Sequence, residues 1–559
     1  MTSQEIFSNP SPKLPSPSIS VSVESTREHP APSQAYTAAT KEGSSKETWE
    51  NDGQYAIGSK VELMFPGPMS KSLDSTQNPF NFQVDVNFKS PDGKSYLVPG
   101  FYDGDGEGGL NGNLWKVRFT PYLAGTWSFQ VQSSNSILDG REGIFEVVEN
   151  PECLADQEYE QNLFCKGFLE AVGEHYFRFK DGEYWLKTGL DDPENFLGSA
   201  FGDWEEKKTQ VDVLSQMGIN SIYAIANNID GDRRDTWPWL GGNEAQAKAN
   251  SDRFDVAKLQ QWEDFFSYIQ QKGIVLHFVF NDDSAWRGYD QALYIREMIA
   301  RFGHNPGIIW NVGEEANEIF SDRDQIEFAD QIKETDPYHH PVTVHRKSPW
   351  PFLGELSFDA ASIQIGDGGA DFSATRLMNI NSIVIEHRER GTQRDHPVPI
   401  MVDETPRITE VNPEIREKFR NQILYPIILG GGNFELHYWD AYGQNGTVSI
   451  PDLEILINDM VALRKLLESF PFPVMQPCNQ ELSNPNNICF GESGNIYIIY
   501  LPDGGSESID LSLTAGNFAY SWFDPRTGGV INTGIVQGSQ ETSINAPDER
   551  DWVLLLEAR

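Results

Sequence analysis

Two short apolar segments of the sequence end at carboxylates. The first, GIIWNVGEEAN, covers residues 307–317, and the second, PIMVDE, covers residues 399–404. Each is too brief for a helix, and an apolar run that stops at an acid is typical of a buried parallel strand. At the ends of strands four and seven of an eightfold barrel, such acids would face each other across one pocket. Two opposed carboxyl groups are what cleavage of a glycosidic bond requires.

Residues 170 to 465 supply the strands that such a barrel needs. Strand-like and helix-like stretches alternate there, which indicates a parallel α/β architecture. Eight strands are expected, at 184–189, 221–225, 275–280, 307–311, 342–345, 362–365, 399–404 and 433–438. An open doubly wound sheet is the alternative, but no GxGxxG or GxxxxGK turn follows any of these strands. The sequence therefore predicts a barrel.

A tail and two β-rich segments are expected outside the barrel. Residues 1–52 are rich in Ser, Pro and Thr, and we expect them to form a disordered tail. Short alternating runs predict a β-sandwich at 53–150 and a smaller one at 469–559, with the barrel at 165–468. The expected fold class is therefore α/β, a (β/α)8 TIM barrel flanked by two β-sandwiches.

One short motif in the first sandwich resembles a calcium loop. The run DGDGE covers residues 103–107, but the twelfth position of the loop is Leu114 rather than the Glu of an EF-hand. We therefore interpret it as a Gly-rich turn.

Composition limits the classes of partner. The 559-residue chain has a formal net charge of −40, which disfavours nucleic acids and anionic membrane surfaces. No apolar run is long enough to predict a membrane span, and the first fifty residues lack the pattern of a secretory signal. Neither CxxC nor His-rich spacing is present, which argues against a structural zinc site.

The four cysteines fall into two local pairs, Cys153 with Cys165 and Cys478 with Cys489. They are either two disulfides or four buried thiols, since sequence does not fix pairing. The pairs favour a secreted or extracytoplasmic protein and the missing signal does not, so localisation stays open.

With this order of segments, the chain resembles a bacterial glycoside hydrolase of the apiosidase-like kind. The N-terminal sandwich resembles an Ig-like domain of unknown function, through FYDG at 101–104, Trp115 and GTW at 125–127. The C-terminal unit resembles a collagen-binding-type β-sandwich, through YIIYLP at 497–502 and WFDPRTG at 522–528. The barrel is similar to those of clan A, the retaining glycosidases.

The clan A resemblance implies two catalytic residues. It makes Glu315, after strand four, the acid/base and Glu404, after strand seven, the nucleophile. The clan usually has Asn immediately before its acid/base, whereas this chain has Glu314, so the register is open by one residue. The charge of Glu314 is expected to raise the pKa of Glu315. The alternative for these acids is a place at a helix start, where the helix dipole favours them.

Further residues at the same rim are expected to bind the substrate. Carboxylates there would accept hydrogen bonds from sugar hydroxyls, and indoles would stack on sugar rings. The predicted set is Glu314, Asp192, Asp282, Trp286, His345, His437 and Trp439. Trp237, Trp239 and Trp350 are further rim candidates, and about half of the five tryptophans should be core instead. Loop capping or packing is the alternative for the polar members.

The expected function is hydrolysis of glycosidic bonds in an oligo- or polysaccharide by the retaining mechanism, with no cofactor and no metal. The main alternative is a catalytically silent carbohydrate-binding or adhesion protein, because a fold alone does not establish catalysis. A metal-dependent barrel hydrolase is disfavoured because paired histidines are missing from the predicted strand ends.

Overall fold

The computed structural model describes residues 48–71, 73, 78–155, 161–191, 196–231, 235–367, 370–373, 379–438, 446–512 and 514–559. The expected tail therefore lies almost entirely outside the described residues.

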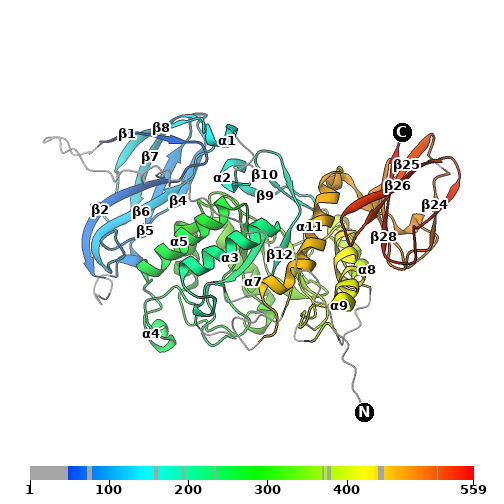
Figure 1. Cartoon of the computed structure of the whole chain (residues 1–559). Coiled ribbons are helices and arrows are strands. Elements are labelled where there is room, and N and C mark those ends of the chain that lie inside the picture. The colour runs from blue at the N-terminus through cyan, green and yellow to red at the C-terminus, as the bar shows by residue number, and fades with distance from the viewer. Residues whose placement is uncertain are drawn as a thin grey trace, which may run out of the picture. The chain divides into compact units, whose positions relative to one another are not determined.

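A parallel barrel occupies the middle of the chain (Figure 1). Its strands are β12 (Thr188–Leu190), β13 (Ser221–Ile225), β14 (Val275–Val279), β15 (Ile308–Asn311), β16 (Val342–Thr343), β17 (His345–Lys347), β18 (Ala361–Gln364), β19 (Ile400–Glu404) and β20 (Asn433–Leu436). The first strand, β12, pairs with both β13 and β20. β16 pairs with β15 and β17 pairs with β18, so they are two halves of strand five, interrupted at Val344. The expected (β/α)8 fold class is confirmed.

Helices follow seven of the eight barrel strands. They are α3 (Trp204–Met217), α5 (Val256–Gln271), α6 (Gln291–Phe302), α7 (Asp322–Thr335), α8 (Ile380–Gln393), α9 (Pro413–Phe419) with α10 (Tyr425–Ile428), and α11 (Glu454–Glu468). Asp203, Asp255, Asp290 and Ser321 cap the first four, because each side chain accepts a hydrogen bond from the free N–H groups of the first turn. Strand five differs, since residues 348–360 form turns rather than a helix.

The first predicted strand, 184–189, is in fact divided in two. β11 (Tyr184–Trp185) pairs antiparallel with β10 (Phe177–Phe179), which pairs in turn with β9 (Leu169–Ala171). Only β12 joins the barrel. The apolar faces of the small sheet pack with residues of β14, β15 and β19, so burial, rather than barrel pairing, explains why Trp185 is apolar.

The N-terminal sandwich has two facing sheets. One contains β1 (Thr48–Ala56), β8 (Glu142–Val148), β7 (Gly125–Ser133), β3 (Val84–Lys89) and β4 (Ser95–Pro99), and the other contains β2 (Val61–Lys71), β6 (Asn111–Phe119) and β5 (Phe101–Tyr102). Phe88 of one sheet stacks on Phe119 of the other at 4.5 Å between ring centroids. β1 begins before residue 53, the expected boundary.

The DGDGE run lies in a turn of this sandwich. Asp105 Oδ1 accepts hydrogen bonds from the backbone N–H groups of Glu107 and Gly109, at 2.9 and 2.8 Å. The Asp103 carboxylate lies 2.7 Å from Lys116 Nζ. Both acids thus serve the protein's own groups, as the interpretation as a Gly-rich turn predicts.

The C-terminal region has a sheet in the order β21 (Gln476–Pro477), β22 (Ile488–Glu492), β23 (Ile496–Leu501), β28 (Trp552–Ala558), β25 (Asn517–Asp524) and β26 (Gly529–Gln537), with a separate pair, β24 (Ser506–Asp510) and β27 (Glu541–Asn545).

Both predicted cysteine pairs are bridged, with Cα atoms 5.3 Å apart for Cys153–Cys165 and 4.8 Å apart for Cys478–Cys489. Among the helices described, none is both long and apolar enough to cross a membrane.

Buried charges join the first sandwich to the barrel. Arg118 of β6 lies 2.8 Å from Glu62 and 3.7 Å from Glu263 of α5. Arg301 of α6 donates a hydrogen bond to the backbone oxygen of Tyr102 at 2.8 Å. Both arginines are fully buried, and each guanidinium lies over the ring of Phe101. Removing one partner would leave a buried charge without compensation, so the interface is rigidly specified.

Candidate active site

Side chains from the carboxyl ends of several barrel strands converge on Glu404, the last residue of β19. Gln364, the last residue of β18, donates a hydrogen bond from Nε2 to Glu404 Oε2 at 2.6 Å. His345 Nε2 and His437 Nδ1 each lie 3.8 Å from the Glu404 carboxylate. The Nδ1 atom of His437 also lies 2.7 Å from the backbone oxygen of Thr405. The predicted residues Glu404, His345 and His437 therefore share one site.

Glu314, His345 and Glu404 form a close group. His345 Nδ1 lies 2.5 Å from Glu314 Oε1, and one ligand atom from each of the three residues lies within 4.8 Å of the others. The backbone N–H of Glu314 donates to the backbone oxygen of Asn281 at 2.8 Å, which ties the loop after β15 to the end of β14. A carboxylate from strand four thus faces a carboxylate from strand seven.

Glu315 has a different position from Glu314. Its backbone is left-handed, with φ of 30° and ψ of 44°, which is uncommon for a residue with a side chain. Its carboxylate groups with those of Asp283 and Glu318, with atoms within 4.8 Å of one another. It is therefore Glu314 that joins the group around Glu404, while the catalytic role expected for Glu315 stays a prediction.

The electrostatics of the group are set by burial and by close charges. Burial raises the pKa of Glu404 to about 8, with the charges of Glu314 and Glu315 adding to the rise and that of His345 opposing it. Burial would lower the pKa of His345, but the charge and hydrogen bond of Glu314 raise it to about 9. His345 therefore carries a proton near neutral pH.

The pKa of Glu315 is raised as well. Burial is the largest cause and the charge of Glu314 is the second. The direction agrees with the expectation from sequence that a neighbouring carboxylate would favour the protonated form.

Several polar atoms of the site are buried without a hydrogen-bond partner among the described residues. They are Glu314 Oε2, His345 Nε2, Gln364 Oε1 and Thr405 Oγ1. A buried polar group without a partner costs about 1–3 kcal/mol, so such groups are rare unless they serve a ligand or water. These atoms offer both donors and acceptors, as hydroxyl groups require.

A network of buried charges lies beneath the group. Lys187 Nζ lies 2.9 Å from Asp403 and 3.0 Å from Glu435. It also lies 2.9 Å from His277 Nδ1, and His277 Nε2 lies 3.0 Å from the side-chain amide of Asn311. All five side chains are fully buried. The lysine neutralises the acid next to Glu404, and its ammonium occupies the space that a metal would need between Asp403, Glu435 and His277.

Asn311 carries this network to the loop of strand four. Its side-chain oxygen accepts hydrogen bonds from the backbone N–H groups of Gly313 and His345, at 3.1 and 3.2 Å. The loop that carries Glu314 is thus held by two contacts, one with the Asn311 side chain and one with the backbone of Asn281.

The other predicted binding residues have mixed outcomes. Asp282 is buried, and its backbone N–H donates to the backbone oxygen of Asn227 at 2.9 Å. Trp286 is half-buried and packs edge-on against Trp239, with ring centroids 5.9 Å apart. Asp192 and Trp439 lie outside the described residues.

Three of the tryptophans considered for the rim are buried instead. Trp239 is 0% exposed, Trp350 is 1% and Trp237 is 8%, so none offers an open face for stacking on a sugar. The indole N–H of Trp350 donates to the backbone oxygen of Val344 at 3.0 Å. A position close to a strand end in the sequence does not show whether a tryptophan anchors its loop in the core or lies exposed at the rim.

Gln364 and Lys187 are site residues that the sequence reasoning missed. Both lie within predicted strands whose other residues are mostly apolar. A polar residue near the carboxyl end of such a strand is a usable signal, because an inward-facing position there lies in the pocket or directly beneath it.

The chain is a (β/α)8 barrel that carries acids in the loop after β15 and at the end of β19, on the side where the carboxyl ends of the strands lie. Solved structures share this fold. A putative glycoside hydrolase from Bacteroides vulgatus ATCC 8482 aligns over 90% of this chain and 100% of its own, with 17% identity and a TM-score of 0.68. A glycoside hydrolase family 5 protein from the same organism aligns over 70% of this chain and 94% of its own, with 15% identity and a TM-score of 0.55. The chain therefore has a glycoside hydrolase fold.

Two segments also match known families. Residues 58–134 match a domain of unknown function, DUF5060, and residues 478–557 match the putative collagen-binding domain of a collagenase. These matches agree with both resemblances noted for the flanking sandwiches. No curated protein matches the sequence.

Proposed function

We propose that this protein is a glycoside hydrolase that cleaves an oligo- or polysaccharide with retention of configuration. The observation that carries the proposal is the convergence of the strand-four and strand-seven glutamates, with Glu314 and Glu404 atoms within 4.8 Å. The separation that distinguishes retaining enzymes (about 5–5.5 Å) from inverting ones (about 6.5–9.5 Å) is the one between the acid/base and the nucleophile. Retention of configuration is therefore proposed from the clan A resemblance and not from the Glu314–Glu404 distance. The likeness to solved glycoside hydrolases supports the same class.

Glu404 is the proposed nucleophile and Glu315 the proposed acid/base. The Glu314 carboxylate lies 2.5 Å from His345 Nδ1, so it is already engaged within the protein. Glu315 is half-buried and its raised pKa favours the protonated form that a proton donor needs. In this assignment Glu314 and His345 bind the substrate, and the charge of His345 lowers the pKa of Glu404.

The reaction has two steps. In the first, the Glu404 carboxylate attacks the anomeric carbon while Glu315 transfers its proton to the leaving glycosidic oxygen, which gives a glycosyl ester and a free alcohol. In the second, Glu315 takes a proton from water as the water oxygen attacks the anomeric carbon and releases Glu404. The positive charge of His345, 3.8 Å from Glu404, favours the ionised nucleophile between turnovers.

The test is a hydrolysis screen on a panel of neutral and acidic glycans. The wild-type protein should release reducing ends from at least one of them, and proton NMR of the first product should show the substrate's anomeric configuration. The Glu404→Gln variant is the negative control, and Glu417→Gln, an exposed glutamate of α9, is the matched control that should retain activity. Saturable binding of a glycan without turnover would instead support the catalytically silent scaffold.

A further inference from the structure

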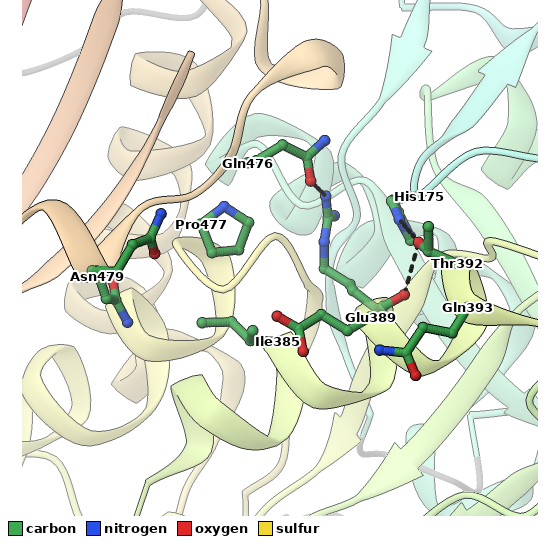
Figure 2. Close-up of a pocket in the computed structure, with 10 residues that line it drawn as sticks. His175, Ile385, Glu389, Thr392, Gln393, Gln476, Pro477 and Asn479 are labelled. Atoms are coloured by element: carbon green, nitrogen blue, oxygen red, sulfur yellow. Dashed lines mark hydrogen bonds between the residues drawn. The ribbon is translucent and has the colours of Figure 1, made fainter. Parts of the chain in front are cut away.

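A cavity of about 380 Å³ lies between α8 and the beginning of the C-terminal β-sheet (Figure 2). His175 lines it, and His175 Nδ1 lies 3.2 Å from the backbone oxygen of Val398, just before β19 begins. Glu404 is at the other end of β19. The cavity is therefore on the side of the barrel opposite to the candidate active site.

One wall of the cavity is a single face of α8. Ile385, Glu389 and Gln393 follow one another at intervals of four residues, so their side chains lie on the same side of the helix. Figure 2 shows these three side chains in a row along the ribbon of α8. This face of α8 therefore presents an apolar side chain, a carboxylate and an amide to the cavity.

The opposite wall comes from the chain that enters the C-terminal sheet. It includes Gln476 and Pro477 of β21, and Asn479 and Gln480 of the short helix η7 (Asn479–Glu481). The amide of Asn479 is engaged within the protein, because Nδ2 donates to Asn381 and Oδ1 accepts from the backbone N–H of Cys489. The Cys478–Cys489 disulfide adjoins this wall, so it is anchored at its base.

The cavity has balanced charge. Arg388 is 3% exposed, and its guanidinium donates to the backbone oxygen of Gly431 at 2.7 Å and to Gln476 Oε1 at 3.2 Å. It therefore holds the two walls together, and Glu389 supplies the opposite charge. Burial and the charge of Arg388 lower the pKa of His175 to about 4, so the imidazole is neutral near pH 7. An anionic ligand would meet the Glu389 carboxylate and an arginine that is buried and already donates to Gly431 and Gln476.

The remaining chemistry suits a ligand rich in hydroxyl groups. Side-chain amides both donate and accept hydrogen bonds, and each hydroxyl group needs both. Gln393 and Gln480 supply such amides, and Gln476 supplies its N–H groups while its oxygen accepts from Arg388. Ile385 and Pro477 supply an apolar surface for the C–H face of a sugar ring. The volume lies within the range of about 300–1,000 Å³ found for small-molecule sites.

We propose that this cavity is a second saccharide-binding site, which holds a neutral sugar unit at the junction of α8 and the C-terminal sheet. It would keep a polymer on the protein while the carboxyl-end face of the barrel acts on another part of it. The site requires no catalysis and stands on its own lining residues, so it goes beyond the proposed hydrolase function.

The test uses a fluorescent reporter beside the cavity. The four cysteines are disulfide-bonded, so one introduced thiol is labelled selectively. Glu386→Cys places an environment-sensitive dye on α8 next to Ile385, and the Glu404→Gln background prevents consumption of the probe. Cellotriose, maltotriose, mannotriose and xylotriose are the probes. A dye at Gln216→Cys, an exposed position in the last turn of α3, is the matched control.

At least one trisaccharide should change the fluorescence at residue 386 saturably, with half-saturation on the order of 1 mM, and leave the dye at residue 216 unaffected. The double substitution Gln393→Ala and Gln480→Ala should raise the half-saturating concentration at least about tenfold, which corresponds to about 1.4 kcal/mol. Circular dichroism should show that the variant remains folded.

The proposal is overturned if no trisaccharide gives a saturable change, if both dyes respond alike, or if the double substitution has no effect. A response to a (Pro-Pro-Gly)10 peptide but not to any sugar would identify a peptide site instead. Because the readout is binding at α8 by an inactivated protein, its failure is distinct from a failure of wild-type hydrolysis.

Discussion

His345 Nδ1 lies 2.5 Å from Glu314 Oε1, while His345 Nε2 lies 3.8 Å from Glu404 on the other side of the ring. The imidazole thus separates the strand-four carboxylate from the strand-seven carboxylate. The charge of His345 lowers the pKa of Glu404 and so offsets part of the cost of a buried negative charge, although burial still raises that pKa to about 8. The ionisation of the proposed nucleophile therefore depends on its neighbours.

Substitution of the proposed nucleophile should abolish turnover. Glu404→Gln keeps the volume and the hydrogen bond to Gln364 but removes the attacking oxygen charge, so kcat should fall at least about 10³-fold. Steady-state kinetics on the screened substrate measure this, and thermal melting checks the fold. Activity within about tenfold of the wild type would refute the assignment.

The two strand-four glutamates should behave differently. Glu315→Gln should lose activity on substrates with poor leaving groups, recover part of it with azide, and retain more on an aryl glycoside, because only the proton donor is missing. Glu314→Gln should raise KM and lower kcat without rescue by azide, since it removes the partner of His345. Rescue of Glu314→Gln instead would make Glu314 the acid/base.

The acid limb of the pH profile should lie above the usual range for a glutamate. Glu404 must be ionised to attack, and burial raises its pKa to about 8, so kcat/KM should rise with pH until that carboxyl loses its proton. The apparent value belongs to Glu404 together with His345 and not to Glu404 alone, because the two groups lie 3.8 Å apart and interact.

A variant of His345 should move this limb to higher pH. His345→Asn removes a positive charge that lowers the pKa of Glu404, so the carboxyl should lose its proton only at higher pH than in the wild type. The pH dependence of kcat/KM measures the shift. An unchanged limb, or one that moves to lower pH, would contradict the arrangement.

Loss of Lys187 should destabilise the barrel. Lys187→Met leaves Asp403 and Glu435 buried without their cation, and breaking a buried pair in this way costs about 3–5 kcal/mol. Urea denaturation followed by tryptophan fluorescence measures the change. Lys208→Met is the matched control, because Lys208 pairs with an exposed Glu205 and such surface pairs contribute about 0–1 kcal/mol.

Both disulfides should be present in protein purified without reductant. Thiol counting under denaturing conditions should find no free thiol among the four cysteines, and reduction should lower the melting temperature. The Cys478–Cys489 bridge closes a loop with a sequence separation of 11, so Cys478→Ala with Cys489→Ala should cost the C-terminal region about 2–4 kcal/mol. Four titratable thiols would show that neither bridge forms.

The fold could be predicted from sequence because the barrel strands are nearly continuous apolar runs. Such runs identify themselves without tertiary information, as the segment before Glu404 illustrates. Strand one could not be predicted correctly, because Tyr184 and Trp185 form an apolar pair that suits a small antiparallel hairpin as well as a barrel strand.

The candidate site was predictable only in part. Glu404, His345 and His437 follow apolar strands and were found for that reason, whereas the choice between Glu314 and Glu315 depends on a left-handed backbone at Glu315 that no residue type announces. The sequence does not identify Gln364 and Lys187, because their partners are distant in sequence. Gln364 bonds to Glu404, 40 positions away, and Lys187 bonds to Asp403, 216 positions away. Only the closed barrel brings those partners together.

The buried arginines between the first sandwich and the barrel restrict how this architecture can be rearranged. A barrel inherited without its N-terminal neighbour would leave Glu263 facing water with its Arg118 contact gone, and a sandwich from another lineage would have to supply a matching guanidinium and a matching ring. Recombination at this boundary would therefore destabilise the protein, which would not happen if a flexible linker joined the two domains. The two parts should pass through evolution as a single heritable unit.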